Sequence, residues 1–290
     1  MALYDEKRVR AALTRVWPDA ATVKTAQIRA LGGGLSPRTF IAVAGPRRHV
    51  LRLPIQSNVA LLDLATEARA MRAAAAADLA PSVIAVDLDE GLLLTDCRAG
   101  SWTPELVRQP IAVTVMVRLL RALHALDVEL PVFAVERIAA GYLAALDAAA
   151  VHLRAEEASW ADELVRLGRH FDASYAATAF CHNDLVATNI LIDGAAARLI
   201  DFEYAGRGTP LLDLASLAGM NDFAVAQRRQ LLDEYYGKAS AAPTLRDLGN
   251  AIRMLRLLAY FWARVAEQRI SGTDVHAKLA ASIAATLRQD

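Results

Sequence analysis

Two stretches of sequence carry the most information about this fold: FCHNDLVATNILI at residues 180–192 and LIDFEY at residues 199–204. They contain short apolar runs with the character of strands, and Gly194 supplies a turn between two of the runs. Three polar side chains, Asp184, Asn189 and Asp201, lie beside these runs. The pattern predicts a strand, a loop and a hairpin, with the three polar side chains at strand ends.

These side chains suit the transfer of a phosphoryl group. A carboxylate can orient an attacking hydroxyl, and an amide with a second carboxylate can hold Mg²⁺ on nucleotide phosphates. We predict that Asp184, Asn189 and Asp201 are catalytic, that Asn189 and Asp201 ligate Mg²⁺, and that ATP is the co-substrate. The alternative is that these residues only form turns; their position at strand ends favours the catalytic interpretation.

The order of the motifs resembles the catalytic loop of protein kinases and the magnesium-binding Asp that follows it. Asn183-Asp184 replaces the Arg-Asp of protein kinases, and Asp201-Phe202-Glu203 replaces Asp-Phe-Gly. Both differences resemble the aminoglycoside phosphotransferase and choline kinase superfamily. The residues of the two motifs are most similar to its choline/ethanolamine kinase branch. The resemblance implies an α+β, protein-kinase-like fold with a small β-rich N-lobe and a large, mostly helical C-lobe.

The pattern of secondary structure divides the chain in the same way. Strand-like segments dominate its first part, at 22–31, 39–44, 49–53, 82–86 and 91–97, with a helix at 59–77. Segments of helical spacing follow at 111–126, 135–150, 156–175, 223–236 and 245–268. We predict an N-lobe at residues 1–97, a hinge at 98–101, and a C-lobe at 102–290 that holds the catalytic loop and the acceptor site.

Composition narrows the class of protein. The 290 residues carry 32 basic and 32 acidic side chains, which argues against a nucleic-acid binder and against a polybasic membrane anchor. No segment reaches about 18 uninterrupted apolar residues, and the N-terminus lacks a signal-peptide core. Cys97 and Cys181 are far apart, so a disulfide framework is not expected. We expect a soluble, cytoplasmic protein whose partners are ATP and a small molecule; the sequence leaves its oligomeric state open.

The triplet Gly32-Gly33-Gly34 lies between two expected strands. Because no helix follows it, a dinucleotide-binding turn is excluded, while a plain hairpin turn and a loop that covers phosphates both remain. Glycines let backbone N–H groups approach phosphates closely, and Gly33, Gly34 and Ser36 resemble the nucleotide-binding loop of choline-kinase-like proteins. The family's Asn is replaced here by Pro37, which has no N–H to donate.

The segment VLRL at residues 50–53 resembles the strand that carries the phosphate-binding cation of this family. A guanidinium can bind phosphate oxygens in a bidentate manner and stays charged when partly buried. We therefore predict that Arg52 contacts the nucleotide and that Glu67, on the next helix, holds it. The alternative is that both are ordinary surface charges. The resemblance also places Asp96 and Arg98 at the hinge, beside the nucleotide.

The acceptor side of the site is less strongly marked. An ammonium substrate needs carboxylates and aromatic faces. Glu203 and Tyr204 directly follow Asp201, and Trp262 lies in an aromatic run where choline-kinase-like relatives carry an aromatic wall. These three are the predicted acceptor-binding residues, although an aromatic cluster on a helix can also be plain core.

Two more residues are predicted to support the catalytic loop. The resemblance assigns this role to His182 and to Asp213, for which a helix-capping carboxylate is the alternative. We predict a kinase that transfers the γ-phosphate of ATP to a hydroxyl of a small cationic amino alcohol, choline or ethanolamine-like. Rival hypotheses are an aminoglycoside-type kinase, another small-molecule kinase (thiamine, methylthioribose, sugar), and a nucleotide-binding pseudokinase scaffold.

Overall fold

The computed structural model describes residues 5–31, 39–54, 64–98, 103–193, 196–237, 239, 242–269 and 274–289. The predicted phosphate loop, with Gly33, Gly34, Ser36 and Pro37, lies outside the described residues. So does most of the predicted hinge at 98–101. Both assignments, and the division of the chain at the hinge, stay predictions.

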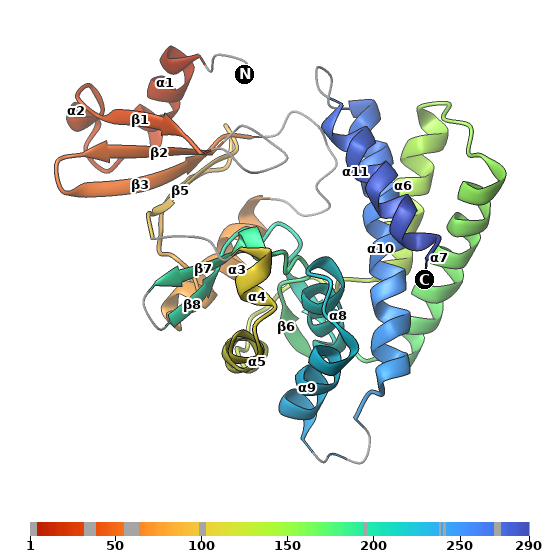
Figure 1. Ribbon diagram of the computed structural model, residues 1–290. Helices are drawn as coiled ribbons and strands as arrows, with labels where there is room; N and C mark the ends of the chain where they lie inside the picture. The colour runs from red at the N-terminus through yellow and green to blue at the C-terminus, as the bar shows by residue number, and fades with distance from the viewer. Residues whose placement is uncertain are drawn as a thin grey trace.

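An antiparallel sheet of five strands forms the N-terminal lobe, in the order β1-β2-β3-β5-β4 (Figure 1). Helix α1 (Glu6–Val16) begins at Asp5, whose carboxylate accepts the N–H groups of Lys7 and Arg8. Its buried face, with Leu13, packs in one core with the sheet. The strands of this lobe are β1 (Gln27–Ala30), β2 (Thr39–Ala44), β3 (Arg47–Arg52), β4 (Val83–Asp87) and β5 (Leu92–Asp96).

The first strand is shorter than the sequence pattern predicts. A short helix, α2 (Ala20–Val23), occupies the start of the expected strand at 22–31, and β1 begins only at Gln27. The cause is local, because the Asp19 carboxylate accepts the N–H of Ala21 and so caps a helical turn. Local capping outweighs the alternation of polar and apolar residues here.

Helices make up most of the remaining chain. The five long helices predicted from periodicity all appear, within a few residues of their expected ends. Helix α11 was not predicted, and it packs against α10 as an additional helix. The helices are α3 (Leu64–Ala76), α4 (Pro104–Val107), α5 (Pro110–His124), α6 (Val135–Ala148), α7 (Ala155–Ser174), α8 (Pro210–Met220), α9 (Val225–Tyr236), α10 (Leu245–Arg269) and α11 (Val275–Leu287).

Two small β-ladders interrupt the helical lobe. Strand β6 (Ala179–Cys181) pairs with β9 (Gly206–Gly208), and β7 (Ile190–Asp193) pairs with β8 (Ala196–Leu199). The second ladder places Ile190 opposite Leu199, and the N–H of Ile200 donates to the carbonyl of Asn189 (3.0 Å). This register brings Asn189 and Asp201 to the same end of the hairpin.

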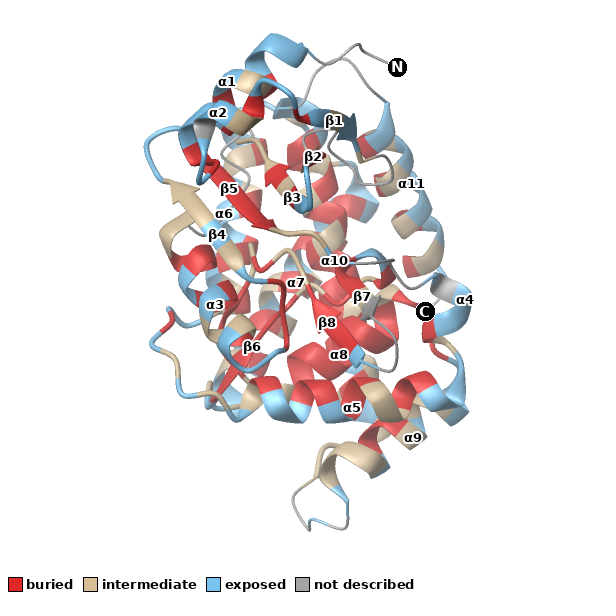
Figure 2. Cartoon of the chain, turned by 90° about the vertical axis from the view of Figure 1, so that its left-hand side faces the viewer, coloured by how far each residue is buried: buried red, intermediate tan, exposed pale blue. Residues whose placement is uncertain are grey.

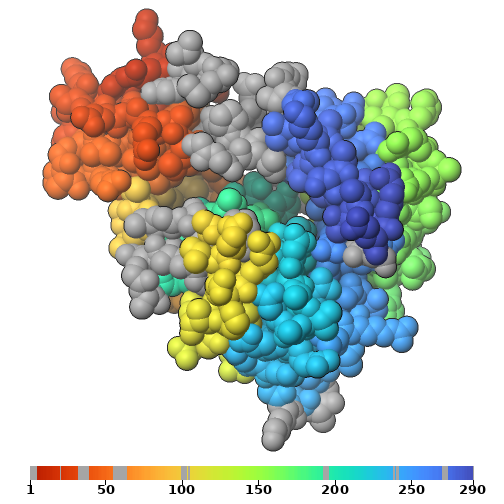
Figure 3. Space-filling model, in the orientation of Figure 1, coloured from red at the N-terminus to blue at the C-terminus, as the bar shows by residue number. Residues whose placement is uncertain are grey.

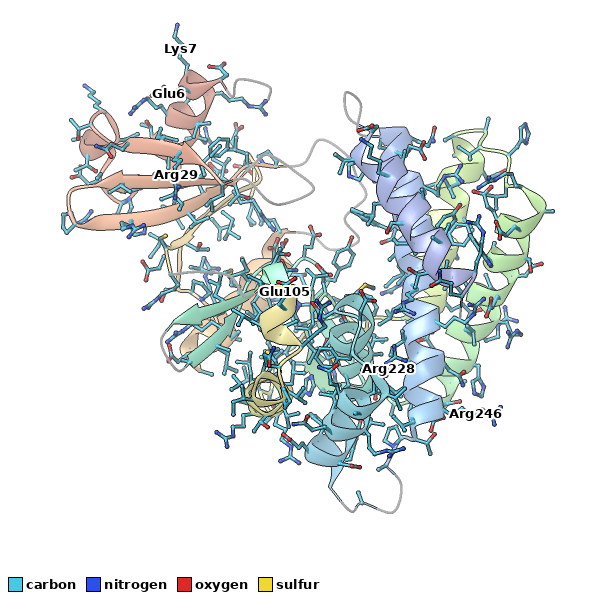
Figure 4. The ribbon with its side chains drawn as sticks, viewed as in Figure 1. Glu6, Lys7, Arg29, Glu105, Arg228 and Arg246 are labelled. Carbon is cyan, nitrogen blue, oxygen red and sulfur yellow. The ribbon has the colours of Figure 1, made fainter. Side chains whose placement is uncertain are left out.

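The buried residues separate into two cores. A small core lies under the N-terminal sheet, and a much larger one runs through the helical lobe, where Figure 2 shows red segments concentrated in α5, α8 and α10. The predicted small β-rich N-lobe and large, mostly helical C-lobe are confirmed. Figure 4 shows Lys7 on α1 in the N-terminal lobe and Arg246 on α10 at the far side of the helical lobe. Within the described residues, no helix is both long and apolar enough to span a bilayer.

Candidate active site

Asn189 holds the side chain of Asp184 in place. Its Nδ2 donates to the backbone carbonyl of Asp184 (3.1 Å) and to Oδ2 of the same residue (2.8 Å). Asn189 ends a short 3₁₀ turn at the start of β7, so the hairpin fixes its position. Since its amide nitrogen is committed to Asp184, its amide oxygen is the atom that can ligate a metal.

Arg52 connects the two lobes at the site. It ends β3, and its guanidinium donates to Oδ1 of Asp201 (2.7 Å) and to Oε2 of Glu67 on α3. Burial lowers the pKa of Arg52, but the two carboxylates outweigh burial and raise it, so the cation stays charged. Glu67 is only 4% exposed, which excludes the alternative that both residues are ordinary surface charges.

Asp213 ties the catalytic loop to the first turn of α8. Its carboxylate is fully buried and accepts the backbone N–H groups of His182 (2.9 Å) and Asn183 (2.6 Å). Its Oδ2 also lies 2.9 Å from Nε2 of His124. Burial raises the pKa of Asp213, but the hydrogen bonds from His124 and from the backbone of His182 lower it further, so the net shift is downward. Asp213 thus fits both predicted roles, as loop support and as a carboxylate near a helix N-terminus.

His182 stabilises the catalytic loop through hydrogen bonds of both ring nitrogens. Its Nε2 donates to the carbonyl of Ile200 (2.9 Å), and its Nδ1 accepts the N–H of Asp184 (3.3 Å). The ring also packs against Phe202, with 4.6 Å between the centroids. Burial lowers the pKa of His182, which keeps Nδ1 available as an acceptor. The ring therefore links the loop before Asp184 to the segment before Asp201.

Two further loop supports were not predicted from the sequence. The Oγ of Ser216 accepts the N–H of Leu185 (2.8 Å), and Nδ2 of Asn221 donates to the carbonyl of Leu185 (2.7 Å). Ser216 and Asn221 lie 31 and 36 residues from Leu185 along the chain, so no local pattern reveals them. The polar Ser216 inside the apolar α8 is the one sequence signal that could have drawn attention to this contact.

The backbone is left-handed at two turns of the site. Asn183 has φ 66° and Asp201 has φ 64°, a region that costs energy for residues with side chains and that Asn and Asp tolerate best. Asn183 is held there by Asp213 and by its own Nδ2, which donates to the carbonyl of Tyr204 (2.9 Å). The strained turns are the ones directly before Asp184 and at Asp201 itself.

Carboxyl groups dominate the centre of the site. The carboxyl groups of Glu67, Asp201 and Glu203 interact with the guanidinium of Arg52, and Asp184 interacts with Asp201 and Glu203. Burial, reinforced by the charge of Asp201, raises the pKa of Asp184 to about 7. The same two causes raise the pKa of Glu203 to about 8. A site with this excess of carboxylates is suited to cations.

The oxygen donors near the hairpin fit a magnesium ion. The carboxylate of Asp201 and the amide oxygen of Asn189 come from the two chain segments that meet at the same end of one register-locked ladder. Hard oxygen ligands of this kind, few in number and supplemented by phosphates, are typical of Mg²⁺ sites in kinases. Burial and the charge of Asp201 raise the pKa values of the neighbouring acids Asp184 and Glu203, and a cation bound among them would lower these values.

Tyr142 is a site residue that the sequence analysis missed. It lies on α6, hydrogen-bonds to the hydroxyl of Tyr204, and feels the charges of Glu203 and Asp184. Burial raises the pKa of both tyrosines, so both remain protonated. A single Tyr within a helix, 42 residues before Asp184, gives no local signal of this contact. Glu203, Tyr204 and Tyr142 thus lie together beside Asp184.

The remaining predicted residues lie apart from this group. Trp262 on α10 is partly buried and packs edge-on against His276 of α11, with 5.8 Å between the ring centroids. Among the described residues, no contact joins it to Asp184 or Glu203. Asp96 ends β5, and its Oδ2 lies 3.2 Å from Nε of Arg98. This ion pair stands at the start of the predicted hinge.

The space-filling view shows where the surface is hollowed. In Figure 3, green and teal atoms from the middle of the chain are set back between the yellow α4 region and the blue α11. The colour bar assigns these atoms to the part of the chain that contains the catalytic hairpins. Part of this segment of the chain is therefore visible from this face, set back from the surrounding surface.

Comparison with known sequences identifies the family of this chain. Residues 27–248 match the model of the phosphotransferase enzyme family, APH. The thiamine kinase of Salmonella heidelberg (strain SL476) is 32% identical over 119 residues, which cover 38% of this chain and 42% of that kinase. The chain thus matches less than half the length of this curated relative.

Comparison with solved structures agrees with the motifs. A choline/ethanolamine kinase family protein from Mesorhizobium loti shares 25% identity at a TM-score of 0.77, over 98% of this chain and 93% of that one. Choline kinase LicA from Streptococcus pneumoniae, also solved in complex with AMP, has a TM-score of 0.79 at 15% identity, over 98% and 99% of the two chains. The resemblance to the aminoglycoside phosphotransferase and choline kinase superfamily is confirmed: this chain belongs to the phosphotransferase enzyme family.

Proposed function

We propose that this chain is an ATP-dependent kinase that transfers the γ-phosphoryl group to a hydroxyl of a small cationic amino alcohol of the choline or ethanolamine kind. The observation that carries this proposal is the excess of buried carboxylates around Asp184, with Glu203 on its acceptor side. Family membership supports the phosphoryl transfer, and the charge of the site supports a cationic acceptor.

Asn189 and Asp201 are the proposed ligands of Mg²⁺. When bound, the ion neutralises negative charge on the phosphates of ATP. Arg52 is proposed to donate to phosphate oxygens while Glu67 keeps its guanidinium anchored. The solved complex of LicA with AMP supports adenine nucleotide as the co-substrate. Gly33, Gly34 and Ser36, with Asp96 and Arg98, complete the proposed nucleotide-binding set.

Asp184 is proposed to orient and deprotonate the acceptor. Its carboxylate accepts the hydrogen bond of the acceptor hydroxyl and takes the proton as the new O–P bond forms, while the bond between the γ-phosphorus and the bridging oxygen of ADP breaks. Because Asn189 donates to Oδ2 of Asp184, Oδ1 is the oxygen that faces the substrate in this scheme. Positioning matters more than base strength for such a loose transition state.

Glu203 is proposed to balance the positive charge of the acceptor. Tyr204 and Tyr142 would complete this subsite, since an aromatic ring attracts an ammonium group. Trp262 stays a weaker candidate, because its described contacts are with α11. A second candidate acceptor is thiamine, a cationic alcohol of a different shape, and the identity to a thiamine kinase favours it specifically.

A panel of acceptors tests the proposal directly. Release of ADP is measured with Mg²⁺–ATP and each of choline, ethanolamine, thiamine and kanamycin. We expect turnover with choline or ethanolamine, and thiamine turnover would transfer the assignment to the second candidate. Turnover with kanamycin alone would overturn the cationic amino alcohol in favour of an antibiotic kinase. Binding of Mg²⁺–ATP without turnover of any acceptor would favour the pseudokinase scaffold.

A further inference from the structure

The support of the catalytic loop extends beyond the loop itself. Asp213 accepts two backbone N–H groups of the loop, and its Oδ2 is also engaged by His124 at the C-terminal end of α5. The His124 side chain is 4% exposed and the Asp213 side chain is completely buried. The orientation of the Asp213 carboxylate therefore depends on a ring that belongs to neither the loop nor α8.

The hydrogen-bond partners of His124 indicate which of its ring nitrogens carries a proton. The pKa of Asp213 is lowered, so Asp213 is an ionised carboxylate that can only accept. Nε2 must then carry a hydrogen to satisfy the 2.9 Å contact, and an Nε2–H tautomer leaves Nδ1 as an acceptor. The hydroxyl of Tyr235 lies 2.7 Å from this Nδ1. Burial raises the pKa of Tyr235, so its hydroxyl keeps the proton that it donates.

Contacts with α5 hold Tyr235 in place. It lies near the end of α9, and the guanidinium of Arg121 both donates to its backbone carbonyl and lies 5.6 Å from the centroid of its ring. Helix α9 is joined to α5 as well through Thr114, whose hydroxyl donates to Glu234 (3.0 Å). The hydroxyl of Tyr235 thus contacts the ring of His124 from α9, a helix that carries none of the predicted site residues.

A metal site is the rival explanation of this cluster. Single donor atoms of His124, Cys181 and Asp213 lie within 4.8 Å of one another. However, both ring nitrogens of His124 and both oxygens of Asp213 already have hydrogen-bond partners. The hydrogen-bond network accounts for the cluster without an ion.

We propose that Tyr235 is a positioning residue of the catalytic loop, which acts through His124 and Asp213. Its hydroxyl fixes the tautomer and the orientation of His124, His124 orients Asp213, and Asp213 holds the N–H groups of His182 and Asn183. Asp184 follows these two residues directly, so a change at Tyr235 alters the placement of its carboxylate. The catalytic part of this inference rests on the proposed kinase function, whereas the hydrogen-bond relay does not.

The neighbouring tyrosine provides a matched control. Tyr236 follows Tyr235 on α9 and packs against its ring, with 4.8 Å between the centroids; among the described residues, no hydrogen bond from its hydroxyl is found. Tyr235→Phe should lower kcat about tenfold, the size of effect expected for one buried hydrogen bond. KM for ATP and for the acceptor should stay within twofold, and Tyr236→Phe should behave as wild type. Equal kcat values for the two variants would overturn the proposal.

Two spectroscopic measurements need no acceptor. In wild type, ¹⁵N shifts of the ring should show His124 as the Nε2–H tautomer, with His124→Gln to assign the signal; the Nδ1–H tautomer would contradict the relay. Amide exchange at His182 and Asn183 should be about tenfold faster in Tyr235→Phe than in Tyr236→Phe. Unchanged exchange would also overturn the proposal. Faster exchange in a protein that turns over no acceptor would instead refute the proposed function and leave the relay standing.

Discussion

The catalytic hairpins and the acceptor side of the site are built in different ways. Around Asp184, backbone groups of the loop are fixed by several buried side chains, among them Asp213 and Ser216. On the acceptor side, Glu203 and Tyr204 lie on one short segment and Tyr142 comes from α6, joined by one hydrogen bond between phenols. The residues proposed for the chemistry thus lie on a backbone that buried side chains hold in place. Recognition of the acceptor, in contrast, depends on a few side chains.

The largest expected effect lies on the rigid side. Asp201→Asn removes the negative charge of the proposed metal ligand and should lower turnover by at least about 10³-fold. Asp222→Asn is a matched control, since Asp222 also has a positive φ of 52° and lies outside the hairpins. Steady-state ADP release measures both variants. A fall in turnover of less than tenfold for Asp201→Asn would contradict the expectation that the catalytic hairpins matter more for turnover than the acceptor side does.

Asp184→Asn should have the next largest effect. The amide cannot accept the proton of the acceptor hydroxyl, and loss of a positioned general base costs on the order of 10²-fold in rate. Affinity for Mg²⁺–ATP, measured by calorimetry, should be unchanged because the Arg52 and Asp201 contacts remain. Full activity in this variant would show that the role of Asp184 has been misassigned.

The sequence predicted the rigid region well and the recognition region only in part. The motif around Asp184 keeps its partners within a short segment, so the hairpin and the meeting of Asn189 with Asp184 follow from local order. The pairing of Arg52 with Glu67 across 15 residues followed from the family resemblance. Tyr142, Ser216 and Tyr235 could not be predicted, because their partners come from distant helices and carry no local pattern.

A smaller effect is expected on the acceptor side. Tyr142→Phe removes the hydroxyl that bonds Tyr204, and we expect KM for the acceptor to rise about fivefold, the value of one modest hydrogen bond. KM for ATP should not change. Tyr175→Phe serves as a control, since this tyrosine bonds to Asp247 instead. A rise in KM for ATP of the same size would show that Tyr142 supports the catalytic hairpins and not the acceptor.

The smallest effect concerns stability and pH. The pKa of buried His182 is lowered by burial, so below about pH 6.5 the unfolded chain binds a proton at this residue that the folded chain does not. The free energy of unfolding should therefore fall as the pH drops below about 6.5, until the folded-state pKa is passed. Urea unfolding between pH 5 and pH 8 should show a weaker fall in His182→Gln. The same slope in both proteins would exclude His182 as the cause.

Binding of a divalent ion is the most direct test of the central claim, that one hairpin brings Asn189 and Asp201 together to hold a metal on ATP. Mn²⁺ can replace Mg²⁺ as a probe, and its electron paramagnetic resonance signal reports the bound fraction in the presence of ATP. We predict tight binding in wild type, and binding weakened by at least about tenfold in Asp201→Asn and in Asn189→Ala. Equal Mn²⁺ affinity in wild type and both variants would contradict the account.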